Sequence, residues 1–323
     1  MSSNANGPLA WLFESLFSAL EASDYVWESV APERLQALRK SAAGYDPLVR
    51  YFGIGLADRL QEVREALLIA GFPEEGLAEI FRLHPSVTRV GDLFIPHSRW
   101  PADSSGPGGA SGYVHLGPES LELGRRLAEV ESRVRGARVL DLGSGSGVLS
   151  LMAARQQAGC VLGLEISERA VEWSNAAAAA QGIANTEFRR LSIGSPEAET
   201  AVSGEPWNLA LSNPPLAVPS PGDRRPHRDG GQLGIELPLL FLDFAAKQLA
   251  PGGEAFFTVT NPIVNGRPAF FDRLDRKRWD IVEKTLLNDH FNASLQRKEG
   301  YAERGISRIE LWFLRLAILP RLR

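Results

Sequence analysis

The sequence predicts an α/β fold built on a mostly parallel sheet, preceded by a smaller and mainly helical N-terminal region. From residue 113 onward, short apolar runs alternate with helix-length amphipathic segments, as in parallel strands joined by crossover helices. Before that point, apolar residues recur at helical spacing, and glycines and prolines divide the stretch into short helices. With 323 residues, the chain is long enough for one large or two modest domains.

We expect three segments along the chain. Residues 1–100 form a helical domain for substrate recognition or for covering a site, with a small hairpin at 87–96. Residues 101–112, PADSSGPGGASG, are the richest in glycine and serine and form either a flexible linker or a mobile lid. Residues 113–323 form the α/β domain.

Seven apolar runs supply the expected strands. In chain order they are ARVLDL (137–142), CVLGLEI (160–166), TEFRRL (186–191), WNLALSN (207–213), GEAFFTVT (253–260), WDIVEKTLL (279–287) and RIELWFLRL (308–316). LSLMAARQQ (149–157) and ERAVEWSNAAAAAQG (168–182) separate early runs and predict helices. No periodic helix separates the last two runs, so we expect an antiparallel hairpin at the sheet edge.

Composition excludes several classes of protein. The single cysteine, Cys160, cannot form an internal disulfide, and its apolar surroundings indicate a structural thiol in a reducing, cytoplasmic setting. The chain has no run of about 18 apolar residues and no basic leader, so we expect neither a membrane span nor a signal peptide. Oligomeric state is not readable from the sequence.

Charge is unevenly distributed along the chain. Residues 1–110 hold 9 Lys and Arg against 14 Asp and Glu, a balance of −5, and the remainder holds 26 against 25, a balance of +1. Because tight nucleic-acid binding generally requires a polybasic surface, this balance argues against a nucleic-acid substrate. It favours a small polar or cationic molecule.

A glycine-rich loop, DLGSGSG at 141–147, follows the first strand of the α/β region and precedes a helix. Its glycines let a ligand approach bare main chain and the helix N-terminus. A tight turn without a ligand would have the same sequence signature. The next strand ends at Glu165, 24 residues after Asp141, where a carboxylate can accept both hydroxyls of a ribose or simply precede the following helix.

The spacing of the loop distinguishes two cofactors. Dinucleotide sites usually carry G-x-G-x-x-G, whereas this loop has G-x-G-x-G with Asp141 two residues before it. An acid at that position would repel a pyrophosphate and would suit a cationic methionine group. The loop therefore favours S-adenosylmethionine over a nicotinamide cofactor.

Asn213-Pro214-Pro215 ends the fourth strand of this region. Consecutive prolines fix the main chain, and Asn213 offers an amide from that rigid point. A planar nitrogen can donate to the Asn213 side chain and the Pro214 carbonyl, which aims its lone pair at a methyl group. The alternative is an ordinary turn in which asparagine is chosen for its tolerance of left-handed backbone.

The order VLDLGSGSG, LEIS and SNPPL resembles that of class I S-adenosylmethionine-dependent methyltransferases with an (N/D)PP(Y/F/W) motif. The HemK-like group, which methylates the glutamine amide of peptide release factors, is the most similar. The resemblance covers about residues 113–318. It implies a Rossmann-like methyltransferase fold with a mostly parallel seven-stranded sheet and an antiparallel edge strand. It also implies S-adenosyl-L-methionine as methyl donor and S-adenosyl-L-homocysteine as product.

The resemblance also assigns roles by position. The residues that it places against the cofactor are Asp141, Gly143, Ser144, Gly145, Gly147, Glu165, Ile166, Ser192 and Asn213. The residues that it places against the acceptor nitrogen are Asn213, Pro214 and Pro215. We expect no metal and no covalent nucleophile, because methyl transfer depends mainly on alignment.

Three positions depart from the family pattern. Leu216 stands where an aromatic residue usually packs on the acceptor, which argues against a nucleobase. Ser192 stands where an acid often binds the adenine amine, and Asn208 also replaces a common acid.

Further acceptor contacts are expected from two stretches. Tyr113 and His115, before the first strand of the α/β region, can wall the pocket, although a lone histidine there is more often structural. After the prolines, Leu216 is also expected to contact the acceptor, and Arg228, Asp229 and Glu236 form either a substrate clamp or a solvated surface.

The expected activity is N-methylation of a small molecule, an amino acid or a protein side chain of the amide or guanidine type. The alternatives are an rRNA or tRNA base N-methyltransferase and a non-catalytic cofactor-binding homologue.

Overall fold

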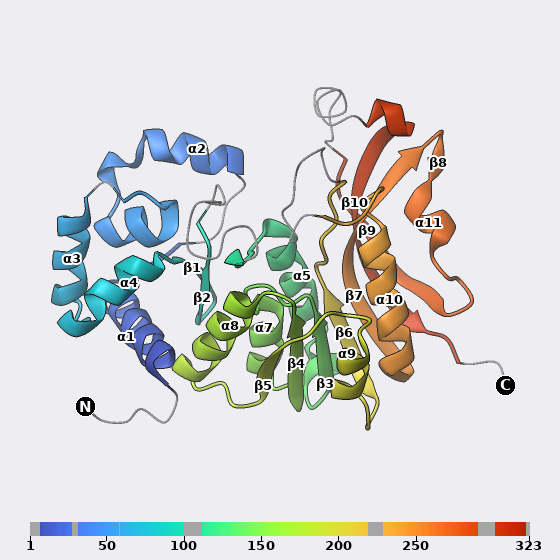
Figure 1. The fold of residues 1–323 in the computed structure, drawn as a ribbon, viewed down its shortest axis with the longest axis horizontal. Helices are drawn as coiled ribbons and strands as arrows, with labels where there is room; N and C mark the ends of the chain where they lie inside the picture. Colours follow the sequence, from blue (N-terminus) through green and yellow to red (C-terminus); the bar gives the residue numbers. More distant parts are fainter. Residues whose placement is uncertain are drawn as a thin grey trace.

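The computed structural model describes residues 7–27, 32–57, 59–99, 112–218, 229–289 and 301–320. An N-terminal helical region lies beside an α/β unit built on one large sheet (Figure 1). Within these ranges no helix is both long and apolar enough to cross a lipid bilayer.

The N-terminal region consists of short helices and one hairpin. Its elements are α1 (Pro8–Ala22), α2 (Pro32–Lys40), α3 (Leu60–Ile69), α4 (Leu77–Leu83), β1 (Ser86–Val90) and β2 (Leu93–His97), with single turns of 3₁₀ or π helix at 42–44, 49–54 and 74–76. The hairpin expected at 87–96 is present, and Val90 pairs with Leu93 across the turn. Gly91 takes the positive φ of 62° that this turn needs.

The sheet of the α/β unit has the seven predicted strands in a mixed arrangement, together with one short strand, β8, that was not predicted. They are β3 (Arg138–Leu142), β4 (Cys160–Glu165), β5 (Thr186–Arg190), β6 (Trp207–Ser212), β7 (Leu249–Val264), β8 (Arg267–Pro268), β9 (Trp279–Asn288) and β10 (Ile306–Ile318). The order is β5-β4-β3-β6-β7-β10-β9, and β8 pairs only with β7. Pairs from β5 to β7 are parallel, whereas β10 is antiparallel to both β7 and β9. The reversed strand therefore lies just inside the edge strand, and the expected Rossmann-like arrangement around a mostly parallel sheet is confirmed.

Helices cover both faces of this sheet. They are α5 (Pro118–Ala128), α6 (Glu131–Val134), α7 (Val148–Arg155), α8 (Glu168–Ala180), α9 (Pro196–Ala201), α10 (Glu236–Gln248) and α11 (Ala269–Arg273). Successive strand residues enter opposite cores, as a period of two requires: Val139 and Val161 pack with α7 and α8, and Leu140 and Leu162 pack with α9 and α10. The strand order reverses beside β3, which is where open α/β sheets bind ligands.

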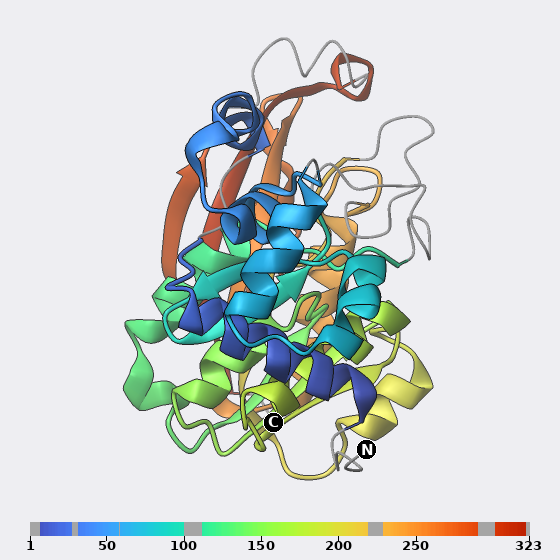
Figure 2. The ribbon, with the colours of Figure 1, turned by 90° about the vertical axis from the view of Figure 1, so that its left-hand side faces the viewer.

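The N-terminal region and α8 share one hydrophobic core. In Figure 2 the N-terminal helices lie in front of the α/β unit, and α1 packs along α8. Phe13 meets the Trp173 ring edge-on with 5.8 Å between centroids. The Gln181 side chain completes the hairpin edge, since it accepts from the Phe94 N–H at 2.7 Å and donates to the Phe94 carbonyl at 3.0 Å.

This shared core makes a prediction about unfolding. Phe13 is fully buried, so we expect Phe13→Ala to cost about 3–5 kcal/mol of the free energy of unfolding. Because its neighbours belong to both regions, far-ultraviolet circular dichroism should still show one cooperative transition, moved to lower temperature. An early separate transition, with the remainder unchanged, would instead indicate that the N-terminal region unfolds independently.

Candidate functional site

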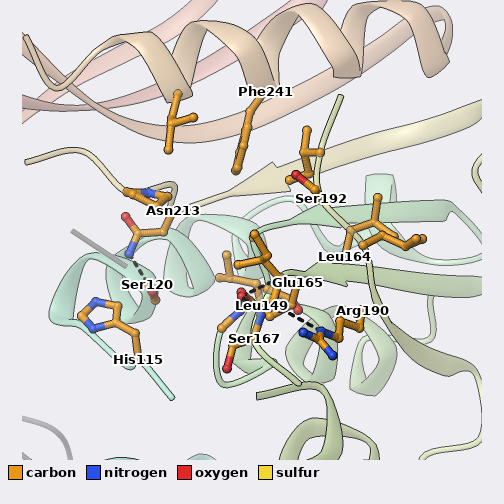
Figure 3. A pocket seen from close by; sticks show the side chains of 18 of the residues that line it. His115, Ser120, Leu149, Leu164, Glu165, Ser167, Arg190, Ser192, Asn213 and Phe241 are labelled. Carbon is orange, nitrogen blue, oxygen red and sulfur yellow. Dashed lines mark hydrogen bonds between the residues drawn. The ribbon is translucent and has the colours of Figure 1, made fainter. Parts of the chain in front are cut away.

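A cavity of about 430 Å³ opens at the carboxyl ends of β3, β4, β5 and β6 (Figure 3). It brings together many of the residues chosen from the sequence. Those that line it are Tyr113, His115, Gly143, Ser144, Gly145, Glu165, Ile166, Ser192, Asn213 and Pro215. The cavity thus gathers predicted residues from segments that are up to 102 residues apart in the chain, from Tyr113 to Pro215.

Other predicted residues do not line the cavity. They are Asp141, Gly147, Pro214, Leu216, Asp229 and Glu236. Arg228 and most of the predicted linker at 101–112 lie outside the described residues.

The glycine loop approaches the segment that crosses above it. Gly145 has a φ of 54°, and a Cβ there would lie 3.1 Å from the His115 carbonyl oxygen. The same carbonyl accepts from the Ser146 N–H at 3.1 Å. Glycine is therefore required at 145 by both backbone conformation and contact, and this contact holds the 113–117 segment over the loop.

Glu165 is fixed at the cavity by main-chain donors. One carboxylate oxygen accepts from Gly145 N–H at 2.9 Å, and the other accepts from Ile166 and Ser167 N–H, each at 2.8 Å. A carboxylate offers about four lone-pair sites, so Glu165 keeps capacity for a ligand hydroxyl. Figure 3 shows it between the loop and the Arg190 side of the pocket.

Asp141 lies beneath the loop rather than on the cavity wall. It is fully buried, and its Oδ2 accepts from Ser150 Oγ at 2.7 Å. Desolvation raises the pKa of its carboxyl to about 7, against the bond from Ser150. Among the described residues, its Oδ1 has no hydrogen-bond partner, and neither does the buried Oγ of Ser144. An unsatisfied buried carboxylate under a glycine loop fits a cationic group such as the methionine amine.

Gly147 does not line the cavity; its lack of a side chain instead lets neighbouring elements pack closely. A Cβ there would come within 2.9 Å of the Phe188 ring and of Ser174 Oγ. The third glycine of the motif therefore lets α7 pack closely against β5 and α8.

Asn213 reaches the cavity with its amide held at both ends. The Nδ2 group donates to Ser120 Oγ at 2.8 Å, a bond drawn in Figure 3, and Oδ1 accepts from Thr258 Oγ1. Ser120 belongs to the first turn of α5 and Thr258 to β7. These two hydroxyls fix the plane of the amide, so a group entering the cavity meets an oriented side chain.

Leu216, the residue after the prolines, is braced by close contacts with Thr260 and Gly234. Thr260 Oγ1 lies 3.0 Å from the carbonyl oxygens of both Leu216 and Gly234, which share its single hydroxyl donor. A Cβ on Gly234, whose φ is 73°, would lie 2.7 Å from the Leu216 oxygen. The glycines of the RDGGQLG stretch thus position the Asn-Pro-Pro-Leu turn.

The two acids expected to clamp a substrate hold this same turn. Asp229 Oδ1 accepts from Gly231 N–H at 2.9 Å. Glu236 Oε2 accepts from Leu233 N–H at 3.0 Å and from Ile235 N–H at 3.3 Å. Asp229 Oδ1 and Glu236 Oε2 are therefore occupied by main-chain donors, and Glu236 Oε1 lies 3.4 Å from Arg273 Nη1; neither acid lines the cavity.

Two glycine-to-alanine substitutions distinguish the energetic cost of left-handed backbone from the cost of a steric clash. Gly182 has a similar φ of 64° but nothing within 4 Å of a Cβ, so Gly182→Ala should cost only the left-handed penalty of about 1–2 kcal/mol. Gly234→Ala adds the clash with Leu216 and should destabilise the protein clearly more in urea denaturation. Equal losses in the free energy of unfolding would mean that Leu216 shifts freely to make room, which would contradict the bracing by Thr260 and Gly234.

Sequence reasoning missed the apolar wall of the cavity. Leu237, Leu240 and Phe241 of α10 line it, and in Figure 3 the Phe241 ring points from above toward the other side chains of the pocket. Leu240 and Ile166 are among the exposed large apolar side chains, at 42% and 61% exposure. Only the position of α10 after the Asn-Pro-Pro loop could have suggested this wall. The three α10 side chains provide an apolar surface suited to a flat ring.

The departure at Asn208 has a structural reason. Asn208 Oδ1 accepts from the main-chain N–H of Arg138 at 2.8 Å and so joins the start of β3 to β6. Among the described residues, no group of three or more His, Cys, Asp or Glu side chains is placed to hold a metal ion.

Comparison with known proteins agrees with this geometry. Residues 133–263 match the family model described as a methyltransferase domain. Over 178 residues the chain is 28% identical to the ribosomal protein L11 methyltransferase of Deinococcus radiodurans, covering 55% of this chain and 56% of that protein. Over 79 residues it is 37% identical to the aklanonic acid methyltransferase DauC of Streptomyces sp. (strain C5), covering 24% and 36%. The chain thus spans about half and about a third of these relatives.

Among solved structures, the ribosomal protein L11 methylase of Lactobacillus delbrueckii subsp. bulgaricus has a TM-score of 0.43 and 17% identity, covering 64% of this chain and 81% of that one. The segment that matches the family model, residues 133–263, begins just before β3 and ends in β7. It therefore includes the glycine loop, Glu165 and the Asn-Pro-Pro turn. Residues 133–263 therefore form a class I S-adenosylmethionine-dependent methyltransferase domain.

Proposed function

We propose that the protein is an N-methyltransferase that acts on a planar or amine nitrogen of a small molecule, an amino acid or a protein side chain. The observation that carries this proposal is Asn213, whose oriented amide lines the same cavity as the glycine loop and Glu165. An amide at this point can accept from an N–H group of an acceptor, and Pro214 adds a carbonyl from a rigid turn.

The cavity supplies a place for each part of the cofactor. From beneath the glycine loop, without lining the cavity, the charge of Asp141 would favour the cationic methionine group. Glu165 would accept from the ribose hydroxyls, and Ile166, Ser192 and Leu240 would surround the adenine. When bound, S-adenosylmethionine supplies an electrophilic methyl group attached to a positively charged sulfur.

The residues around the acceptor act by alignment. Ser120 and Thr258 fix Asn213, and the braced turn fixes Pro214 and Pro215, so the acceptor nitrogen would be held in one direction. Such positioning is worth about 7–11 kcal/mol in favourable cases. Leu237 and Phe241 would exclude water from the same space.

The division of labour along the chain is also part of the proposal. Residues 1–100 would contribute to acceptor recognition, and 113–323 would bind the cofactor and carry the reaction. The Asn-Pro-Pro motif supports a HemK-like specificity for an amide-type or guanidine-type nitrogen. The −5 balance of residues 1–110 disfavours an RNA acceptor.

A labelling experiment tests the proposal. The purified protein is incubated with methyl-labelled S-adenosylmethionine and, separately, with amino acids and alkylamines, with peptide release factor and with RNA. Label is expected in a small-molecule or protein fraction. Transfer to RNA alone would favour the base methyltransferase, and no transfer by a protein that binds S-adenosylhomocysteine would favour the non-catalytic homologue.

A further inference from the structure

An extended stretch at 113–116 forms one wall of the cavity. Tyr113 and His115 line the cavity, whereas Val114 and Leu116 belong to the core that the N-terminal region and α8 share. This alternation is that of an extended chain, whose successive side chains point to opposite sides. The stretch therefore has one face toward a ligand and the other face in the shared core.

Ser98, the residue after β2, holds this stretch through two hydrogen bonds to one residue. The Ser98 N–H donates to the Val114 carbonyl, and Ser98 Oγ accepts from the Val114 N–H, both at 2.9 Å. Val114 is fully buried, so its main-chain groups need partners within the protein. The Ser98 hydroxyl supplies the acceptor for the Val114 N–H, and we call this pair of bonds the Ser98 clamp.

A buried histidine connects the Ser98 clamp to the N-terminal hairpin. His97 Nδ1 lies 2.9 Å from the Ser98 carbonyl oxygen, and His97 Nε2 lies 3.0 Å from Thr88 Oγ1. Because a carbonyl oxygen can only accept, Nδ1 donates to Ser98 and Nε2 accepts from the Thr88 hydroxyl. Burial lowers the pKa of His97 to about 4, so the ring is neutral at neutral pH, as this arrangement requires. The hairpin thus fixes the residue that holds the cavity wall.

Beyond Val114, the chain is tied to both parts of the proposed site. The His115 carbonyl accepts from the N–H of Ser146 in the glycine loop at 3.1 Å. Ser120, in the first turn of α5, holds the amide of Asn213. Figure 3 shows His115, Ser120 and Asn213 on one side of the pocket. A shift of the stretch would therefore move the wall that lies beside the Asn213 amide.

We propose that Ser98 is a positioning residue for methyl transfer, which fixes Tyr113 and His115 in the cavity wall and so gives the N-terminal hairpin a part in holding the acceptor. This inference rests on the proposed methyltransferase function and deepens it, because it names a contact through which residues 1–100 act on the site. Ser98 does not line the cavity, so it acts through Val114 and not by touching a ligand.

Three variants distinguish positioning from general stability. Ser98→Ala removes the acceptor of the Val114 N–H, and Ser98→Thr keeps a hydroxyl on the same carbon. Ser23→Ala is the matched control, because it removes a serine hydroxyl that donates to the Ala19 carbonyl at 2.8 Å elsewhere in the N-terminal region. Circular dichroism first establishes that each variant has the secondary structure of the wild type.

Hydrogen exchange of the cofactor-free protein, followed by mass spectrometry, tests the Ser98 clamp without any acceptor. The peptide that contains residues 113–117 should exchange about tenfold faster in Ser98→Ala, as the loss of a hydrogen bond from one buried N–H allows. Ser98→Thr and Ser23→Ala should exchange like the wild type.

Methyl transfer is then measured with the acceptor found by labelling. Ser98→Ala should lower kcat/KM for the acceptor by about tenfold, because the wall beside Asn213 is no longer held in one position. Affinity for S-adenosylhomocysteine should stay nearly unchanged, since the contact of His115 with the glycine loop is kept. Ser98→Thr should restore kcat/KM, which recovery of stability alone would not require.

Three results would overturn the inference: unchanged exchange of 113–117 in Ser98→Ala, unchanged kcat/KM in that variant, or a loss of kcat/KM of the same size in Ser23→Ala. A parallel loss of S-adenosylhomocysteine affinity in Ser98→Ala would also overturn it, because the clamp would then serve the cofactor site. Failure of the wild type to bind S-adenosylhomocysteine would contradict the proposed function itself, so the two failures are distinguishable.

Discussion

Asp141→Asn is expected to stabilise the cofactor-free protein at pH 8 and to abolish its measurable binding of S-adenosylmethionine. The pKa of the Asp141 carboxyl is raised from an ordinary 3.8 to about 7, chiefly by desolvation. The ionised carboxylate is thus destabilising in the folded protein. Asparagine can still accept from Ser150 Oγ but carries no charge, so it removes this penalty and also the attraction for a cationic ligand.

The sign of the pH dependence follows from proton binding. Between pH 3.8 and about 7 the folded protein keeps a proton on Asp141 that the unfolded chain has lost. Stability therefore falls as pH rises through this interval, and a penalty of about 4 kcal/mol is fully present above it. Asp141→Asn should show the largest gain in urea denaturation at pH 8 and little gain at pH 4.

Whereas stability falls as pH rises, the affinity for the cofactor should increase with pH. Because a cation favours the ionised carboxylate, binding of S-adenosylmethionine should strengthen from pH 6 to pH 8 in the wild type, and calorimetric titration measures it. Ser150→Ala, which removes one hydrogen bond to Asp141 without changing the charge, is the matched control and should retain binding. If Asp141→Asn bound the cofactor as well as the wild type, Asp141 would have only a structural role.

Asn213→Ala is expected to lower methyl transfer by about a hundredfold or more while leaving affinity for S-adenosylhomocysteine nearly unchanged. The substitution removes the oriented amide that lines the cavity between Ser120 and Thr258. The glycine loop and Glu165 make no side-chain contact with Asn213 among the bonds described, so the cofactor end should persist. Turnover with the acceptor found by labelling and calorimetry with S-adenosylhomocysteine give the two quantities.

Thr258→Val provides a graded comparison, because it removes one of the two hydroxyls that hold the amide. Its turnover should lie between those of the wild type and Asn213→Ala. Equal loss of turnover and of cofactor affinity in Asn213→Ala would count against the assigned role, since it would show that the cofactor site had collapsed.

The sequence was informative where function depends on local spacing. The glycine loop, Glu165 and the Asn-Pro-Pro turn each follow a strand, and parallel strands bring their carboxyl ends together. Alternation of apolar runs and helices was therefore enough to place Gly145, Glu165 and Asn213 around one cavity. The hairpin at 87–96 was predictable for the same reason, because its turn residues are local.

Contacts between distant segments could not be read in this way. Ser120 and Thr258 approach Asn213 from elements 93 and 45 residues away, and nothing in their own sequence surroundings marks them. The burial of Asp141 beneath its loop depends on packing with Ser150, so a motif residue expected on the wall lies below it. Likewise, only the folded chain shows that Gln181 completes the hairpin at Phe94.

Calorimetric titration of the wild-type protein at pH 8 with S-adenosylhomocysteine, and in parallel with NAD, tests most directly whether this cavity is a methyl-donor site. We expect one saturable site for S-adenosylhomocysteine and no heat of binding for NAD. Binding of NAD, or no binding of S-adenosylhomocysteine at millimolar concentration, would contradict the proposal.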